Sequence, residues 1–474
     1  MCCPSVISYV YLVYSSAMAS EGASGAASGG QLQEKLDLSK ETDAKIEQAR
    51  TLVNAGQLPE ALALLSALEK QCRVGNDNPS LVRVCEESLK LCRQVGDEDA
   101  MVDTIQSLVT RRSQKTSAVK ALVQTALPWC VEEPFAPLPV STDSEIAFRD
   151  RLVVVLRDVT DGKLFLERER AQLTRALATI KEQQGDISEA ANVLQDVHVE
   201  TYGSLSKKDK IEFILEQMRL TLAKKDFVRA AIVAGKVSKK NLAEENMKTY
   251  KVQFYTLMTI YHRHDKNALD LARDYHAIYL TPHILADGVK WREALQATVV
   301  FLALSPYDNE QQDMLNRIAL EENLEKLPAC KKTIDLLLKK EIINYPMTHQ
   351  AELEALPVCH EGGEDLAAHW HEVFHRRIIQ HNIRVVSVYY KRIHGARLAQ
   401  LLQLEPARVE KEIASMVSEG SIYAKIDRPK DIVRFSQPKT AEAVLSDWAS
   451  DIDKLLNLVE TTTHLIDKEN MTSS

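Results

Sequence analysis

RIHGARLAQLLQLEPARVEKEIASMVSEGSIYAKIDRPKDIVRFS, residues 392–436, decides the fold of the C-terminal part of the chain. Its first half repeats apolar residues at helical spacing, and Pro406 stands where a first-turn residue needs no amide hydrogen. Gly420 suits the left-handed residue that ends a helix. The second half alternates apolar and polar residues in two short runs around a turn at 428–431, where proline presets φ. Two helices followed by two short strands predict a winged helix.

A further helix is predicted over about residues 440–468. Its apolar side chains recur in steps of three and four, as in a helix that packs along other helices. Flanking leucines widen the apolar face, which favours a bundle of several helices. We predict that part of this stripe contacts partner subunits, and the alternative is packing within its own domain. The predicted contact residues are Leu445, Trp448, Ile452, Leu455 and Val459.

Upstream of the winged helix, from about residue 40, the chain alternates helical patterns with small polar turns. Four segments share a turn followed by an alanine-rich helix start, at 55–62, 184–191, 225–231 and 265–269. Glycine and aspartate suit the turn, and alanines let two helices approach closely. The predicted fold is therefore mainly α: a right-handed, TPR-like helical-repeat solenoid, then a winged-helix module and a C-terminal helix. A generic helical bundle is the alternative to the solenoid. Residues 345–363 are expected to form an exposed loop, and one long helix is expected from 364 to 393.

Composition limits the classes of partner. The chain has 474 residues, 45% of them hydrophobic and 27% charged, with a formal net charge of −8. A mildly acidic chain is a poor candidate for binding nucleic acid through its whole surface. No window holds the roughly eighteen apolar residues that a membrane span requires. Neither nucleic acid nor a membrane is therefore expected as a partner.

The cysteines and the N-terminal residues bear on the cellular compartment of the protein. The eight cysteines are irregularly spaced without a Cys-x-x-Cys, which favours reduced, mostly buried thiols of an intracellular protein over a zinc site. Residues 6–13 are apolar, but no Lys or Arg precedes them, which disfavours a secretory signal. An upstream extension, with Met18 as the true start and a flexible tail at 19–30, is the preferred interpretation.

One segment matches a zinc-protease pattern literally, namely His371-Glu372-Val373-Phe374-His375. Ile378 stands where the longer form of that motif has glycine, so the helix is expected to continue. His381 would then lie about 15 Å along the axis from His371, too far for one ion to bind both. A zinc hydrolase stays an alternative, but no phosphate loop or Gly-x-Ser-x-Gly elbow accompanies the pattern. We expect no enzyme activity, no cofactor and no metal.

The winged helix raises the question of DNA binding. The helix at 405–419, which would read the major groove, carries four glutamates against Arg408 and Lys411. A groove-reading helix needs a cationic face, so nucleic-acid binding is kept as the alternative of another class. Protein contact through the small sheet is favoured. The residues predicted for contact, on the outward strand faces, are Tyr423, Lys425, Ile432 and Arg434; ordinary solvent exposure is the alternative.

A helical array, a winged helix and a terminal helix together resemble the PCI family, named for subunits of the proteasome lid, the signalosome and a translation initiation factor. Several runs are similar to the proteasome lid members. The wing turn at 428–431 departs from the family pattern because it lacks glycine. The similar runs are residues 177–205, 210–220, 305–311, 381–393 and 461–469.

The resemblance implies a non-catalytic scaffold that supports ATP-dependent degradation of ubiquitinated proteins in the cytoplasm and nucleus. Winged helices of such subunits pack side by side, and their terminal helices gather in a bundle. Implied partners are other PCI and MPN lid subunits, including the lid deubiquitinase, and the proteolytic core. The signalosome or an initiation factor complex is the alternative assembly. The expected parts are a disordered tail (1–35), the solenoid (36–250), the PCI domain (251–436, with helical part 251–391 and winged helix 392–436) and the bundle helix (437–474).

Overall fold

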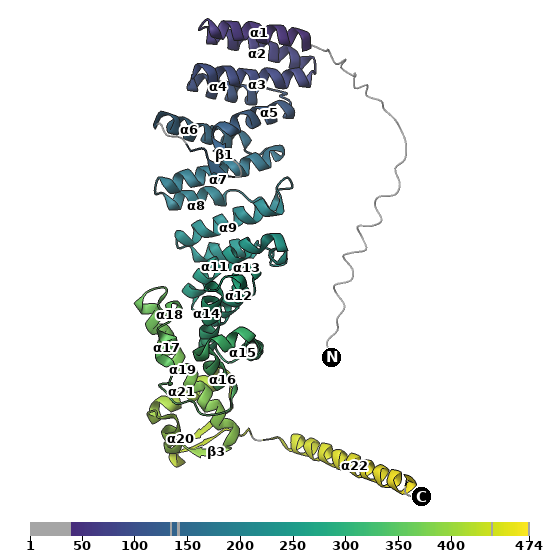
Figure 1. The fold of residues 1–474 in the computed structure, drawn as a ribbon, viewed down its shortest axis with the longest axis vertical. Helices are drawn as coiled ribbons and strands as arrows, with labels where there is room; N and C mark the ends of the chain where they lie inside the picture. The colour runs from purple at the N-terminus through teal and green to yellow at the C-terminus, as the bar shows by residue number, and fades with distance from the viewer. Residues whose placement is uncertain (1–38, 133–134, 140–142, 438, 473–474) are drawn as a thin grey trace. The chain divides into compact units, whose positions relative to one another are not determined.

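The computed structural model describes residues 39–132, 135–139, 143–437 and 439–472 (Figure 1). The predicted tail and the segment around Met18 lie outside these residues. Helices dominate the described chain, and helical repeats are followed by a winged helix and a terminal helix. The predicted fold class is thereby confirmed. The chain forms two compact units, divided between Gln184 and Gly185, and the predicted boundary at 250/251 stays a prediction.

The first unit is a stack of helices that bury apolar side chains between them. The first helix packs on the second, the second on the third and the third on the fifth. Leu65, Leu81 and Leu89 are among the largest fully buried side chains. The elements are α1 Ser39–Asn54, α2 Leu58–Val74, α3 Asn78–Val95, α4 Glu98–Thr110, α5 Thr116–Ala126, η1 Leu127–Trp129, β1 Val131–Glu132, β2 Ala136–Pro137, α6 Asp143–Thr160, η2 Leu164–Leu166 and α7 Glu167–Gln183.

A left-handed residue recurs in the turns between helices, often followed by a side chain that caps the next helix. Gly96 has φ +75°, and the Asp97 carboxylate accepts a hydrogen bond from the Ala100 amide at 3.0 Å. Such caps satisfy amides that the first helical turn leaves unpaired. The four predicted turns follow this backbone pattern. Their left-handed residues are Gly56, Gly185, Lys225 and Lys266.

The second unit begins with further helices and continues into the long helix α19. Two expectations are corrected: residues 345–363 contain the short helices α17 and α18 with Leu353 and Val358 buried, and α19 ends at Tyr389 rather than at 393. The elements are α8 Ile187–Gln195, η3 Val199–Thr201, α9 Lys207–Ala223, α10 Phe227–Gly235, η4 Asn241–Ala243, η5 Glu245–Met247, α11 Lys248–Asp265, α12 Ala268–Tyr279, α13 Pro282–Ala286, α14 Lys290–Leu304, α15 Asn309–Ala319, η6 Glu322–Lys326, α16 Pro328–Leu338, α17 Gln350–Glu354, α18 Pro357–His360 and α19 Glu364–Tyr389.

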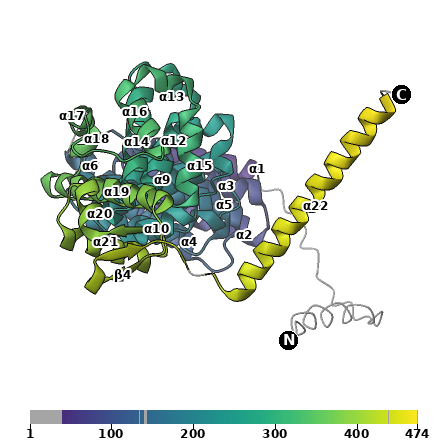
Figure 2. The ribbon, with the colours of Figure 1, turned by 90° about the horizontal axis from the view of Figure 1, so that it is seen from below.

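The winged helix has three strands instead of the predicted two, because a short strand precedes its helices. The sheet is antiparallel in the order β3-β5-β4 and packs on α20 and α21 through a shared core (Figure 2). The predicted second helix and its glycine stop, Gly420 at φ +75°, are confirmed. The elements are β3 Arg392–His394, α20 Gly395–Leu402, α21 Pro406–Ser418, β4 Lys425–Asp427, η7 Arg428–Lys430, β5 Ile432–Arg434 and, beyond the module, α22 Ala441–Thr472.

Candidate protein-interaction surfaces

The sheet of the winged helix has one buried and one outward face. Ile393 and Val433 are buried, and Ile426 packs against the same core. Because side chains alternate along a strand, the residues on either side of these three point away from the core. The register therefore decides which side chains are neighbours on the outward face.

On the outward face, Arg434 lies directly opposite Lys425 on β4 and opposite Arg392 on β3. Ile432 occupies the next position of the same face and is half-buried. The structure thus brings together three of the four predicted contact residues, whereas Tyr423 precedes β4 and is half-buried. Sequence reasoning missed Arg392, because it assigned no strand there. The sequence signal that could have indicated a strand is an apolar residue, Ile393, between two polar ones; in the structure Ile393 is buried and its two neighbours are exposed.

Asp431, an acidic residue of the wing turn, binds the wing to the start of the helix α20. It adopts a left-handed conformation, φ 48° and ψ 46°, in the wing turn 428–431, which lacks glycine. Aspartate tolerates this conformation better than most residues. Its backbone carbonyl accepts from the Gly395 amide at 2.9 Å, and its carboxylate accepts from the Ala396 amide at 3.0 Å. Asp431 therefore closes the wing turn and caps the start of α20 at once.

The helix α22 carries the second predicted surface. Leu445, Trp448 and Leu455 are each at least 60% exposed, and Ile452 and Val459 are also exposed. All side chains described on this helix are exposed, so within the described residues nothing covers the stripe. Several large apolar side chains exposed together are typical of a protein-binding surface. Contact with partner helices stays a prediction.

The zinc-protease-like histidines point to three separate partners. As the sequence predicts, α19 continues through Ile378. His371 lies 2.7 Å from a Glu354 carboxylate oxygen, and the His375 ring stacks on Tyr345 with centroids 4.1 Å apart. His381 is buried against the Glu341 carbonyl, and burial lowers its pKa. Among the described residues, no group of three potential ligands could hold a metal.

An apolar cavity of about 300 Å³ lies between α14 and α16–α19. Its wall includes Trp370 and Phe374, with Glu354 and His371 among its few polar groups. Cys359 is the nucleophilic residue type in this wall, but burial raises the pKa of its thiol to about 11. The reactive thiolate is therefore scarce at neutral pH, and the cavity offers no activated nucleophile.

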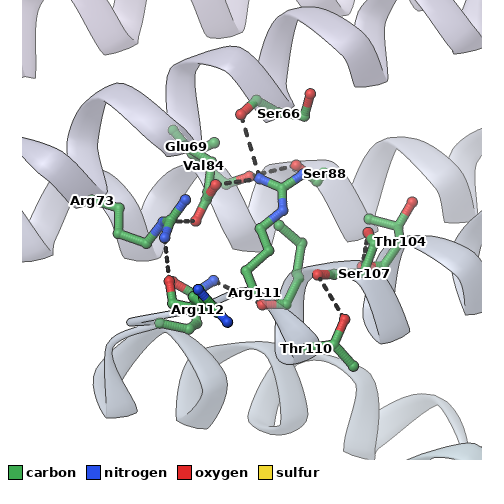
Figure 3. Close-up of polar contacts among 12 residues, drawn as sticks. Ser66, Glu69, Arg73, Val84, Ser88, Thr104, Ser107, Thr110, Arg111 and Arg112 are labelled. Atoms are coloured by element: carbon green, nitrogen blue, oxygen red, sulfur yellow. Dashed lines mark hydrogen bonds and ion pairs between the residues drawn. The ribbon is translucent and has the colours of Figure 1, made fainter.

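Figure 3 shows a polar cluster in the first unit, in which arginines surround a buried glutamate. Glu69 is fully buried on α2. Its carboxylate forms ion pairs with Arg73 of the same helix, at 3.2 Å, and with Arg111 of the segment after α4. Arg111 also reaches the Ser66 carbonyl, and Arg73 donates to the Arg112 carbonyl. A buried carboxylate needs such partners to offset its lost hydration. The cluster joins α2 to the turn that follows α4.

Three family models match separate parts of the chain. The model described as "PSMD12/CSN4, N-terminal" matches residues 60–287, and the PCI domain matches 350–437. The model described as "26S proteasome regulatory subunit RPN5 C-terminal domain" matches 442–474, which includes most of α22. In the described part of the chain, no helix has both the length and the apolarity needed to cross a membrane.

Full-length relatives agree with these matches. The 26S proteasome non-ATPase regulatory subunit 12 of Dictyostelium discoideum is 37% identical over 441 residues, which cover 92% of this chain and 95% of that protein. The 26S proteasome regulatory subunit RPN5 of Saccharomyces cerevisiae is 34% identical over 86% of this chain and 90% of its own. The PCI-domain model spans the winged-helix surface, and the C-terminal model spans most of α22.

Proposed function

Since the chain belongs to the family of the 26S proteasome non-ATPase regulatory subunit 12, we propose that it is a non-catalytic structural subunit of the proteasome lid. In this role it supports the degradation of ubiquitinated proteins in the cytoplasm and nucleus. The observation that carries the proposal is the full-length similarity, which includes the terminal helix as well as the PCI domain.

The two surfaces give the proposal a physical basis. The apolar stripe of α22 is exposed. Burying it against a partner would contribute a favourable free energy of about 25 cal/mol for each Å² of apolar surface removed from water. A bundle with terminal helices of other subunits would provide that burial. The outward face and edge strands of the winged-helix sheet offer a second contact to a neighbour. The partners would be other PCI and MPN subunits of the lid, including its deubiquitinase, and the proteolytic core.

Two alternatives are less well supported. The N-terminal family model is named for a signalosome subunit as well as for the proteasome subunit, so it does not separate the two assemblies. The C-terminal match and the full-length relatives favour the proteasome over the signalosome and initiation factors. Nucleic-acid binding is disfavoured because the two glutamates of α21, Glu410 and Glu412, offset its two cations and leave no cationic face for the phosphates.

Affinity purification of the tagged full-length chain from cells, followed by mass spectrometry, tests the proposal. We expect the PCI and MPN subunits of the proteasome lid to co-purify in comparable amounts. Recovery of signalosome or initiation-factor subunits in their place would indicate that the chain is a scaffold subunit of that assembly instead. A chain that purifies without stable partners would contradict the scaffold role itself.

A further inference from the structure

The outward face of the winged-helix sheet carries a row of three cations. Arg392, Arg434 and Lys425 are exposed and directly opposed across β3, β5 and β4. Directly opposed residues of antiparallel strands have Cβ atoms about 5 Å apart, so like charges stand side by side. Such an arrangement opposes folding of the isolated sheet unless negative charge is supplied to it.

The described residues do not supply that charge through ion pairs with the row. Two nearby carboxylates are engaged elsewhere: Glu410 binds Arg428 at 2.7 Å, and Asp431 caps α20. Within the described chain, no ion pair joins Arg392, Arg434 or Lys425 to a carboxylate. Asp427 is the carboxylate that shares the face with the row, so three cations stand against one anion and the face keeps a net positive charge.

The surroundings of the row suit a polypeptide. β4 lies at one edge of the sheet, and an edge strand can pair with an added segment. A hollow of about 670 Å³ beside it is lined by Lys425 and Arg434, and by Ala414 of α21. Ile432 on the same face adds apolar surface.

We propose that this face receives an acidic segment of a neighbouring lid subunit, one that also carries apolar side chains. The inference rests on the proposed function and adds the chemistry of the partner. Opposite charge on the neighbour would speed docking and reject neighbours without it. A nucleic-acid backbone would also supply negative charge, but it has no peptide main chain to pair with the edge strand β4 and no apolar side chains to cover Ile432.

Site-specific cross-linking tests which segment lies on the face. A photoreactive benzoylphenylalanine replaces Ile432 in the tagged full-length chain, complexes are irradiated, and cross-linked peptides are sequenced. We expect a peptide of another protein with aspartates or glutamates around the cross-linked position. A neutral or basic peptide, a cross-link to the chain's own α22, a cross-link to nucleic acid, or no cross-link would each overturn the inference.

A charge variant tests the row itself. Arg392→Gln/Lys425→Gln/Arg434→Gln is compared with a matched control on the helices of the same module, Arg397→Gln/Arg408→Gln/Lys411→Gln. At low salt we expect the first variant to recover about tenfold less lid protein than the wild type, and the control to match the wild type. The difference should shrink at high salt, where surface charges are screened.

The stability of the charge variant separates lost docking from misfolding. Removing opposed like charges should leave its thermal unfolding midpoint equal to or above that of the wild type. If wild type and variant recover lid subunits equally at low salt, this inference fails and the proposed function stands. If the wild type itself recovers no lid subunits, the proposed function fails.

Discussion

At the scale of single residues, two acidic side chains hold separate elements together. Asp431 binds the amides at the start of α20 from the far end of the wing, and Glu69 binds arginines from α2 and from the segment after α4. The Asp431 carboxylate accepts from the Ala396 amide and the Glu69 carboxylate binds two arginines, so loss of either carboxylate would leave its donors without a partner. The pair of Glu69 with Arg73 is local, at i,i+4, but the contacts of Asp431 with Ala396 and of Glu69 with Arg111 do not follow from local sequence, because the partners lie 35 and 42 residues apart.

Gly395→Ala should destabilise the winged helix by about 1–3 kcal/mol. A Cβ at this position would overlap Asp431 Oδ1 and come within 3.1 Å of its Cγ. The aspartate would have to move, and the Ala396 amide would lose its acceptor. Denaturant unfolding monitored in the winged-helix module measures the change. Gly288→Ala is the control, since its Cβ would meet nothing within 4 Å; equal stability of the two variants would contradict the role of Asp431.

Glu69→Gln should destabilise the first unit by about 1–3 kcal/mol, because two arginines then face a neutral amide. Arg73 and Arg111 keep part of their hydration, which limits the cost below that of a fully buried pair. The matched control is Glu47→Gln, which removes an exposed pair with Arg50 worth at most about 1 kcal/mol. Chemical denaturation of the full-length variants gives both values, and a loss for Glu47→Gln as large as for Glu69→Gln would contradict the argument.

At the scale of elements, the helices with strong apolar periodicity could be predicted from the sequence, whereas short strands that pair with distant residues could not. The helices α21 and α22 and the repeat turns follow from apolar spacing, proline and glycine. β3 has only three residues and is a strand because it pairs with β5, some 40 residues later. Its absence from the prediction also hid Arg392, the third member of the cation row. α17 and α18 are too short for periodicity to reveal them.

The helix α22 should be required for assembly but not for folding. Deleting residues 440–474 should leave a soluble helical protein that no longer co-purifies with lid subunits, because the helix contributes only exposed side chains to the described chain. Circular dichroism and co-purification measure the two properties. Normal recovery of lid subunits by the truncated chain would refute this role.

Two substitutions on the stripe of α22 test the same helix without shortening the chain. Leu455→Asp/Val459→Asp should abolish recovery of lid subunits while changing the stability of the free chain by less than about 0.5 kcal/mol, because both residues are exposed. Asn457→Asp/Thr461→Asp adds the same charge away from the stripe and should retain the lid subunits. Equal loss in both variants would indicate that charge on the helix, rather than the apolar stripe, controls assembly.

At the scale of the whole molecule, the chain consists of two compact units, and each has its own apolar core. In helical-repeat proteins, stability is approximately a sum of repeat and nearest-neighbour terms, so a local defect spreads only to adjacent repeats. The Glu69 cluster belongs to the first unit and the contact between Gly395 and Asp431 to the second. The consequences of disturbing the two should therefore be separable.

Hydrogen exchange should show this separation directly. Glu69→Gln should speed amide exchange in α2–α5, and Gly395→Ala should speed it in β3–β5, α20 and α21, since exchange reports the local free energy of opening. Because the two sites share no partner, the double variant should show the sum of the two effects to within about 0.5 kcal/mol. Mass spectrometry of peptides from the exchanged full-length chain resolves both regions in one experiment. Faster exchange in the winged helix of the Glu69→Gln variant would mean that the units unfold as one, and the additivity would then fail as well.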